Sequence, residues 1–378
     1  MSYFAATQLP SGGWDTSDPA DFSCGFSTVD VALAIVQAGQ TGPSWSATEA
    51  DAAVAGVSTG GNSAWDYLDE QAEGLCGTPS VGKAAQMIIL AVAADHDPAA
   101  FDPAGDGTPV DLVAMLDAGI GNGSYGSIYT APYAAGANIA LGRSVPATTV
   151  EWLLAQQNPD GGFETGFGAD SDSTALTVVA LVAGGVSPSS DAIQNALGFL
   201  ASLRNDDGGF TSFAPGDPSS PNSTGLVILG VTAAGYDVNE ACWSGVAESD
   251  YVSPDQYLRS TQAADGSWSG FSPVFAGAQA VQGLLRSYIP SVVGPAIPCE
   301  LTGPGDPGPP GGPDDPADDP PTGDPGETQV GGETEVPATP ATLPATGLAP
   351  VTTGGLVAAA LLILLGTVTV LTSRRVRI

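Results

Sequence analysis

Gln156–Gly185 reads QQNPDGGFETGFGADSDSTALTVVALVAGG, a polar turn with two glycines and an aromatic residue that leads into a run of small and apolar residues. Similar stretches occupy Thr7–Gly39, Leu203–Gly235 and Thr261–Arg286. Two further copies, LCGTPSVGKAAQMIILAVAAD and GNGSYGSIYTAPYAAGANIALGR, are degenerate. A unit that recurs along a chain indicates a repeat architecture, so the protein is predicted to consist of copies of one helical hairpin.

The second helix of each unit is apolar on most faces, which predicts that it is buried. These inner helices are expected at Ser27–Ala38, Ser80–Ala94, Thr130–Leu141, Ser171–Ala183, Ser223–Ala234 and Pro273–Arg286. The first helices alternate apolar and polar residues at helical period and are expected outside, as in Thr149–Gln157, Ser189–Leu203 and Pro254–Gln262. A ring of buried helices inside a ring of outer ones predicts an all-α (α/α)6 toroid over residues 1–300.

The first outer helix is short, because only Ser2–Gln8 is present before the first turn. The opening MSYFAATQLP has no charged segment and no long apolar run, so it does not resemble a signal peptide. We expect the natural chain to start upstream, with the rest of this helix and an export signal.

The unit NPDGGFETGFGADSDSTAL resembles the prenyltransferase and squalene-oxidase repeat. Proteins with this repeat include terpene cyclases, protein prenyltransferase β subunits and the α-domains of cobalamin carriers. The resemblance implies a terpenoid cyclase-like toroid. It does not define the function, because one toroid can carry several unrelated activities.

The resemblance to class II cyclases implies that the middle acid of a DxDD motif protonates an alkene. Asp170-Ser171-Asp172-Ser173 occupies the matching place, but its last position is serine, so the set of three carboxylates is incomplete. Asp and Ser also cap helix N-termini, and we expect this role for Asp172. Asp30, in the sequence STVD, is expected to form a capping box.

Protein prenyltransferases activate a thiol on zinc held by Asp, Cys and His. The only histidine, His96, is predicted to lie far from any cysteine, which departs from that pattern. The loop Asp95–Asp111 carries carboxylates that could hold calcium, but it lacks the EF-hand spacing and a closing Glu. We therefore expect a solvated loop and no metal site.

The N-termini of the inner helices converge at one mouth of the toroid, where they can hold a polar or anionic group of a small-molecule ligand. Lys83, the only lysine of the chain, lies in the first turn of an apolar helix. The aromatic residues of the turns, such as Trp14, Phe163 and Trp268, are expected to tie helix ends together. The candidate residues at the mouth are Asp30, Lys83, Tyr133, Asp172, Asn222 and Gln279.

The charge of the chain is strongly negative, with 8 Lys+Arg against 41 Asp+Glu and a net charge of −33. Nucleic acid is excluded as a partner because phosphate binding needs clustered basic residues. The four cysteines form no CxxC pair, which favours disulfides in an oxidising compartment. Cys24 and Cys76 stand at the same offset before the first two inner helices, and Cys242 and Cys299 follow the last two. We predict the disulfides Cys24–Cys76 and Cys242–Cys299.

Residues 301–342 are rich in Pro, Gly and Asp, which predicts a disordered linker that spans the cell wall. An apolar stretch follows at 351–372, long enough for one transmembrane helix. The basic residues after it place the C-terminus in the cytoplasm by the positive-inside rule: Arg374, Arg375 and Arg377.

Leu343-Pro344-Ala345-Thr346-Gly347 lies just before the apolar stretch. An LPxTG motif, an apolar span and a basic tail in this order resemble the sorting signal read by sortase, here over 343–378. The resemblance implies cleavage between Thr346 and Gly347 and covalent attachment of Thr346 to peptidoglycan. The membrane helix would then hold only the precursor, whereas an ordinary tail-anchored membrane protein would keep it.

These observations together predict a secreted, cell-wall-anchored protein whose toroid acts as a ligand-binding or interaction module rather than an enzyme. The catalytic sets of the related cyclases and prenyltransferases are incomplete, and no cofactor is required. Three alternatives stay open: a terpene-cyclase-like enzyme that uses Asp172 as its acid, a carrier of cobalamin type, and a surface adhesin.

Overall fold

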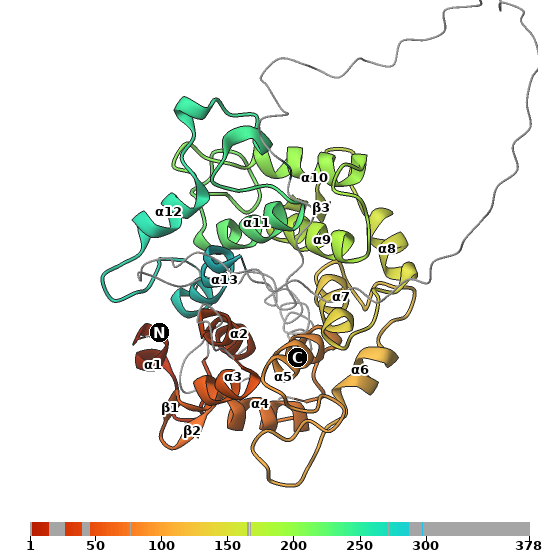
Figure 1. The fold of residues 1–378 in the computed structure, drawn as a ribbon, viewed down its shortest axis with the longest axis vertical. Helices are drawn as coiled ribbons and strands as arrows, with labels where there is room; N and C mark the ends of the chain where they lie inside the picture. Colours follow the sequence, from red (N-terminus) through yellow and green to blue (C-terminus); the bar gives the residue numbers. More distant parts are fainter. Residues whose placement is uncertain are drawn as a thin grey trace, which may run out of the picture.

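The computed structural model describes residues 2–14, 27–39, 46–75, 77–164, 166, 168–270, 272–286 and 297. The inner ring consists of α2 (Ser27–Gly39), α5 (Val81–Ala93), α7 (Thr130–Ala140), α9 (Ser171–Ala183), α11 (Pro221–Ala233) and α13 (Pro273–Leu285). Each of these helices contacts the next, and α13 contacts α2, which closes the ring (Figure 1). The structure is thus an all-α toroid, as the repeats predict.

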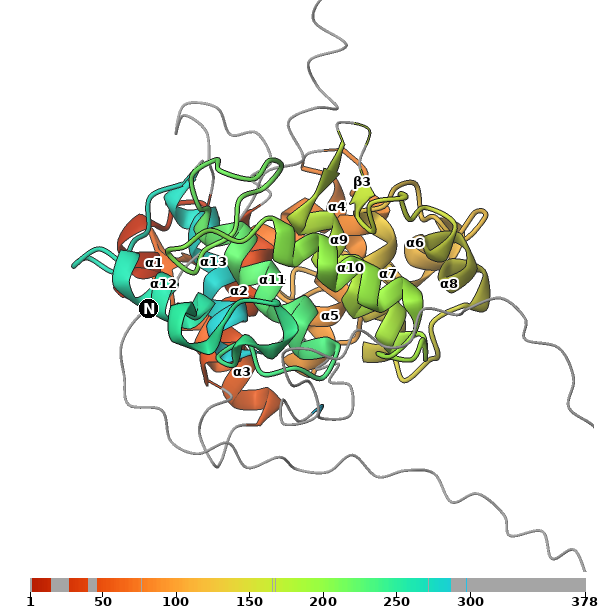
Figure 2. The same cartoon turned by 90° about the horizontal axis from the view of Figure 1, so that it is seen from above.

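The outer elements alternate with the inner helices along the chain and surround them in Figure 1. They are α1 (Ser2–Thr7), α3 (Ala47–Ala55), α4 (Ala64–Glu73), α6 (Leu112–Ala118), α8 (Ala147–Leu154), α10 (Asp191–Ser202) and α12 (Pro254–Thr261). Two short hairpins and two 3-10 turns complete the described part: β1 (Ser58–Thr59) with β2 (Asn62–Ser63), β3 (Phe163–Glu164) with β4 (Ala169–Asp170), η1 (Ala241–Trp243) and η2 (Glu248–Asp250). The hairpin of β3 and β4 leads into α9 on one side of the toroid (Figure 2).

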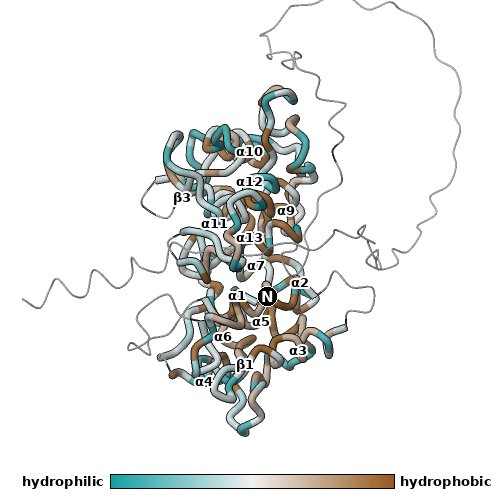
Figure 3. The backbone as a smooth tube through the Cα atoms, turned by 90° about the vertical axis from the view of Figure 1, so that its left-hand side faces the viewer, coloured by the Kyte–Doolittle hydropathy of each residue, from teal (hydrophilic) through white to brown (hydrophobic). Residues whose placement is uncertain are grey.

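Burial separates the two classes of helix as the sequence pattern predicts. In α11 every residue except Thr232 is buried, whereas α10 buries only Ile193, Ala196, Leu197 and Leu200. The α10 residues follow the i, i+3, i+4, i+7 spacing of one helix face. In Figure 3 much of α2, α5 and α9 is hydrophobic, in keeping with their place in the inner ring.

Small residues let the inner helices approach each other closely. A Cβ atom on Gly225 of α11 would lie 2.3 Å from the backbone oxygen of Gln279 on α13. Gly283 of α13 is equally confined, because its Cβ would lie 2.6 Å from the backbone oxygen of Gly225. The glycines at this crossing therefore set the distance between α11 and α13.

The repeated turn makes the same hydrogen bond in three units. The backbone N–H of the aromatic residue donates to a threonine hydroxyl on the following inner helix: Trp14 to Thr28 at 2.9 Å, Phe163 to Thr174 at 3.0 Å and Phe210 to Thr224 at 3.0 Å. The indole N–H groups of Trp14 and Trp268 donate to backbone oxygens of the preceding outer helices, at 2.8 and 2.7 Å. This confirms that these aromatic residues tie helix ends together.

Several sequence predictions lie outside the described residues. They include the linker 301–342, the LPATG motif and the apolar stretch 351–372. Among the residues that the structure describes, no helix is long and apolar enough to span a membrane. Cys24, Cys76 and Cys299 also lie outside, whereas Cys242 is described and is disulfide-bonded. The two disulfide pairings therefore stay predictions.

Candidate functional site

Asp170 is the N-cap of α9. Its Oδ1 atom accepts a hydrogen bond from the backbone N–H of Ser173 at 2.7 Å, and its Oδ2 atom accepts one from the Ser173 hydroxyl at 2.6 Å. The hydroxyl of Tyr129, which directly precedes α7, donates to Asp170 Oδ1 at 3.3 Å. The expectation that Asp172 caps this helix is therefore wrong, because the residue two positions earlier has the extended backbone and the geometry of the cap.

Asp172 lies in the first turn of α9 and is only 4% exposed. The hydroxyl of Ser171 donates to Asp172 Oδ1 at 3.1 Å. Burial raises the pKa of Asp172, while the nearby polar side chains of Ser223, Ser171 and Asn222 lower it in part. The side chain is thus a buried carboxyl group that faces the neighbouring inner helix α11 and has no capping role.

The two carboxyl groups influence each other. Burial, and then the charge of Asp172, raise the pKa of Asp170 to about 7. Because interacting carboxyl groups titrate as a unit, this raised pKa belongs to the pair rather than to one aspartate alone. Burial first, and the nearby carboxylates second, raise the pKa of Tyr129 and Tyr133 well above 10, so both phenols keep their protons.

A second polar group joins α2, α5 and α13. The side-chain amide of Gln86 on α5 donates to Asp30 Oδ1 at 3.0 Å, and that of Gln282 on α13 donates to the Asp30 backbone oxygen at 3.4 Å. Burial raises the pKa of Asp30 to about 6, opposed by the charge of Lys83. Burial lowers the pKa of Lys83 to about 8, opposed by the charge of Asp30. The carboxylate expected to form a capping box thus interacts with the next inner helix.

The structure brings most of the candidate mouth residues into one electrostatic group. Asn222 interacts with Asp172, and Asp30 with Lys83. Tyr133 connects the two sets because the charges of both Asp30 and Asp172 raise its pKa. Gln279 on α13 is 4% exposed, and its Oε1 atom has no hydrogen-bond partner in the described part of the chain.

Three members of this site were not among the candidates from sequence. Tyr129 directly precedes the helix rather than lying within it, and Gln86 and Gln282 lie beyond the first turn of theirs. Gln86 follows Lys83 by three residues, a spacing that places both on one helix face. That spacing is the signal that could have found it.

His96 lies away from this group. Its Nε2 atom is 2.9 Å from Asp51 Oδ1 on the outer helix α3, and its ring packs against Trp65 of α4 with 4.6 Å between ring centroids. This histidine therefore belongs to the packing of the outer elements.

No family profile matches the chain. A segment of 87 residues is 39% identical to the drimenyl diphosphate synthase of Streptantibioticus cattleyicolor, and the match covers 22% of this chain but only 16% of that protein. The fold is similar to that of a variant of the type II terpene cyclase MstE from Scytonema, solved in complex with its substrate geranylgeranyl dihydroxybenzoate. The TM-score of this match is 0.51 and the sequence identity 14%, over 74% of this chain and 82% of that one. Unliganded MstE matches with a TM-score of 0.49 and 15% identity, over 71% and 79%.

The fold is therefore that of a terpenoid cyclase-like toroid. The expectation of a non-catalytic binding or interaction module is wrong: the solved structure and the curated relative are both enzymes of terpenoid chemistry, which favours the cyclase alternative. The incomplete DxDD set had weighed against an enzyme, but the structure shows that two of its carboxyl groups are buried side by side.

Proposed function

We propose that the toroid is a cyclase of type II, which starts the cyclisation of a linear isoprenoid by protonating an alkene. The observation that carries the proposal is the pair of carboxyl groups buried at the head of α9, both with pKa values raised by burial. The likeness in fold to a type II terpene cyclase and the match to a drimenyl diphosphate synthase support it.

We assign the donated proton to Asp172, because it stands at the middle acid of the DxDD-like sequence Asp170-Ser171-Asp172-Ser173, the position that protonates the alkene in class II cyclases. Asp170 accepts hydrogen bonds from the Ser173 backbone, the Ser173 hydroxyl and Tyr129, and donors of this kind stabilise an ionised carboxylate. It also lies at the positive end of the α9 dipole as its cap. Asp172, itself only 4% exposed and next to that carboxylate, is the group that we infer keeps the proton and can donate it.

In the proposed reaction the Asp172 carboxyl O–H protonates one alkene carbon, and the electron pair of that alkene forms the new C–H bond. The carbocation closes rings by attack of the remaining alkenes, and loss of a proton elsewhere ends the sequence. Substrate and product are therefore isomers. The neutral rings of Tyr129 and Tyr133 lie beside the acid pair, where aromatic faces stabilise positive charge.

Serine at the last position of the motif is compatible with this chemistry. Ser173 donates from its backbone and from its hydroxyl to Asp170, and so holds that carboxylate in place. Burial alone raises the pKa of Asp172, and burial followed by the charge of Asp172 raises that of Asp170, so neither shift needs a third acid.

The test is incubation of the purified full chain with geranylgeranyl diphosphate, farnesyl diphosphate and geranylgeranyl dihydroxybenzoate, followed by mass spectrometry of the products. Cyclic isomers are expected from at least one of them, and Asp172→Asn should reduce their formation at least 100-fold, as for loss of a general acid. Asp206→Asn, the same chemical change at an exposed position, should leave it unchanged. Product formation by Asp172→Asn at the wild-type rate would refute the assignment.

We also propose that the chain is exported and anchored to the cell wall through Thr346. The order of LPATG, apolar stretch and basic tail supports this. Muralytic digestion of host cell walls, followed by peptide mass spectrometry, should release peptides that end at Thr346 and carry peptidoglycan fragments. A protein that stays entirely in the membrane fraction, with residues 347–378 intact, would contradict the proposal.

A further inference from the structure

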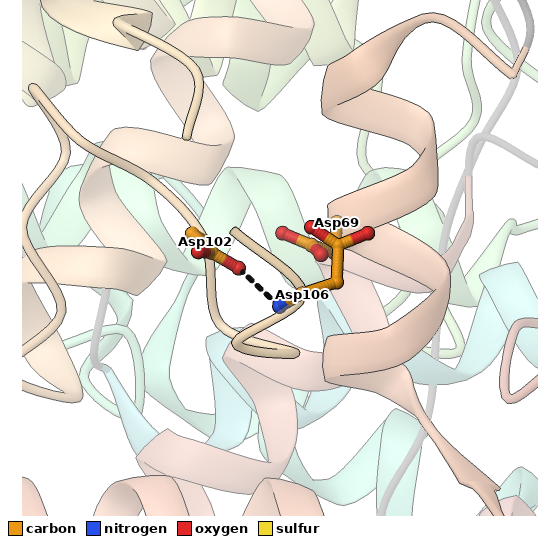
Figure 4. A group of neighbouring side chains, drawn as sticks. All are labelled: Asp69, Asp102 and Asp106. Atoms are coloured by element: carbon orange, nitrogen blue, oxygen red, sulfur yellow. Dashed lines mark hydrogen bonds between the residues drawn. The ribbon is translucent and has the colours of Figure 1, made fainter. Parts of the chain in front are cut away.

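Three carboxylates meet outside the inner ring, where the loop between α5 and α6 passes the outer helix α4 (Figure 1). Asp69 comes from the middle of α4, and Asp102 and Asp106 come from the loop. One oxygen from each lies within 4.8 Å of the others. Figure 4 shows the three side chains gathered between the helix and the loop.

Asp69 provides an independent sign of a missing ligand. Its side chain is only 2% exposed, and its Oδ1 atom has no hydrogen-bond partner among the described residues. A buried carboxylate oxygen without a donor is costly, because water no longer solvates it. The other two carboxylates of the cluster, which face it, cannot supply a donor when they are ionised.

The surroundings add negative charge to the cluster. The carboxylates whose charges act on Asp69 are those of Asp102, Asp106, Glu73 and Asp66. The sequence contains no Lys or Arg from residue 84 to residue 142. A positive ion is the direct way to compensate this arrangement.

The loop holds its two carboxylates in place through its own backbone. Asp102 accepts hydrogen bonds from the backbone N–H groups of Asp106 at 3.0 Å and Gly107 at 3.1 Å. Asp106 Oδ1 accepts one from the backbone N–H of Thr108 at 2.9 Å and another from the Thr108 hydroxyl. Each oxygen of Asp102 keeps a second lone pair, and Oδ2 of Asp106 accepts none of these bonds, so both carboxylates are held in place and can still coordinate an ion.

We propose that Asp69, Asp102 and Asp106 bind a calcium ion that fastens the loop between α5 and α6 to α4. Calcium accepts 6–8 oxygen ligands in flexible geometry, and three carboxylates, each able to bind through one or both oxygens, meet this need together with water. Magnesium usually takes one or two carboxylates and keeps several waters, which fits a cluster of three acids less well. The loop, which the sequence predicts to be solvated, thus supplies two ligands of the proposed site. The third ligand, Asp69, comes from the helix α4.

The site is separate from the acid pair of α9, so its test does not depend on the cyclase activity. The purified full chain is stripped of metal with EDTA, dialysed, and titrated with CaCl₂ in a calorimeter. One ion per chain should bind, with a dissociation constant of about 10⁻⁴ to 10⁻³ M, as for extracellular calcium modules. At a hundredfold excess over this constant, calcium should raise the Tm by roughly 5 °C.

The variant Asp102→Asn/Asp106→Asn changes two loop residues that are not buried, so the fold should persist, and its circular dichroism spectrum checks this. It should lose both the calorimetric signal and the calcium-dependent rise in Tm, whereas Asp206→Asn should keep them. Asp69→Asn tests the helix half of the site and should also abolish binding. The proposal is overturned if the wild-type chain shows no saturable binding of calcium, if it prefers magnesium, or if the double variant binds calcium as the wild type does.

Discussion

The hydrogen bond between the Phe163 backbone N–H and the Thr174 hydroxyl, 3.0 Å long, lies in a region closed to water. Both residues are completely buried. Replacing Thr174 with valine keeps the shape of the side chain but leaves the N–H without an acceptor. An unsatisfied buried donor costs about 1–3 kcal/mol, and the added methyl group offsets part of this, so we expect a loss of about 1–2 kcal/mol.

Thr177, one turn later on the same helix, provides the matched control. It is equally buried, but its hydroxyl oxygen has no hydrogen-bond partner among the residues described. Thr177→Val therefore removes a buried polar atom without breaking a bond, and it should leave stability unchanged or raise it slightly.

Thermal unfolding of the full chain, followed by far-ultraviolet circular dichroism, measures both variants. At about 2 °C per kcal/mol for a domain of this size, Thr174→Val should lower the Tm by about 2–4 °C. Thr177→Val should stay within about 1 °C of the wild type or exceed it. Equal losses for the two variants would refute the reasoning, because the loss would then follow from the removal of any threonine hydroxyl rather than from the turn hydrogen bond.

Three further predictions concern packing and titration. Gly225→Ala should destabilise the toroid by about 2 kcal/mol or more, because the new Cβ meets the Gln279 backbone at 2.3 Å. Gly198→Ala in α10 is the control: there is open space around this glycine, so the change should stabilise the toroid by about 0.5–1 kcal/mol in the same unfolding assay. Because Lys83 is the only lysine, ¹³C-lysine NMR should show one signal that titrates with a midpoint at about pH 8. Asp30→Asn removes the opposing charge and should shift this midpoint to a lower pH. A midpoint near pH 10.5 in the wild type would contradict the burial of the Lys83 side chain. Cyclisation should fall about tenfold per pH unit above about 7, because the acid pair then loses its proton, and a rate that rises through this range would exclude a carboxylic acid donor.

The repeat pattern predicted the inner helices closely. Ser171–Ala183 is observed without change, and the helix expected at Ser223–Ala234 is found at Pro221–Ala233. This agreement has a physical basis, because an inner helix is apolar on nearly all faces and is preceded by a glycine-rich turn, so its composition marks both its type and its start. The outer helices are less regular: α3 and α4 are two short helices separated by a hairpin.

The acid pair shows the limit of reasoning from the motif alone. The letters of Asp170-Ser171-Asp172-Ser173 do not reveal which aspartate caps the helix, because that depends on the backbone conformation at the boundary. Once Asp170 takes the cap, Asp172 has a different environment, set by residues of α11 that are distant in sequence. The calcium site was missed for the same reason, since Asp69 reaches the loop only through the tertiary fold.

Cyclisation in deuterium oxide tests the central claim most directly. If the Asp172 carboxyl group, which exchanges its proton with solvent, starts the reaction, each molecule of cyclic product should carry one deuterium from the first protonation and should keep the head group of its substrate. A cyclic product without deuterium, or one that has lost its diphosphate, would contradict protonation by Asp172 and indicate that the reaction begins by another route.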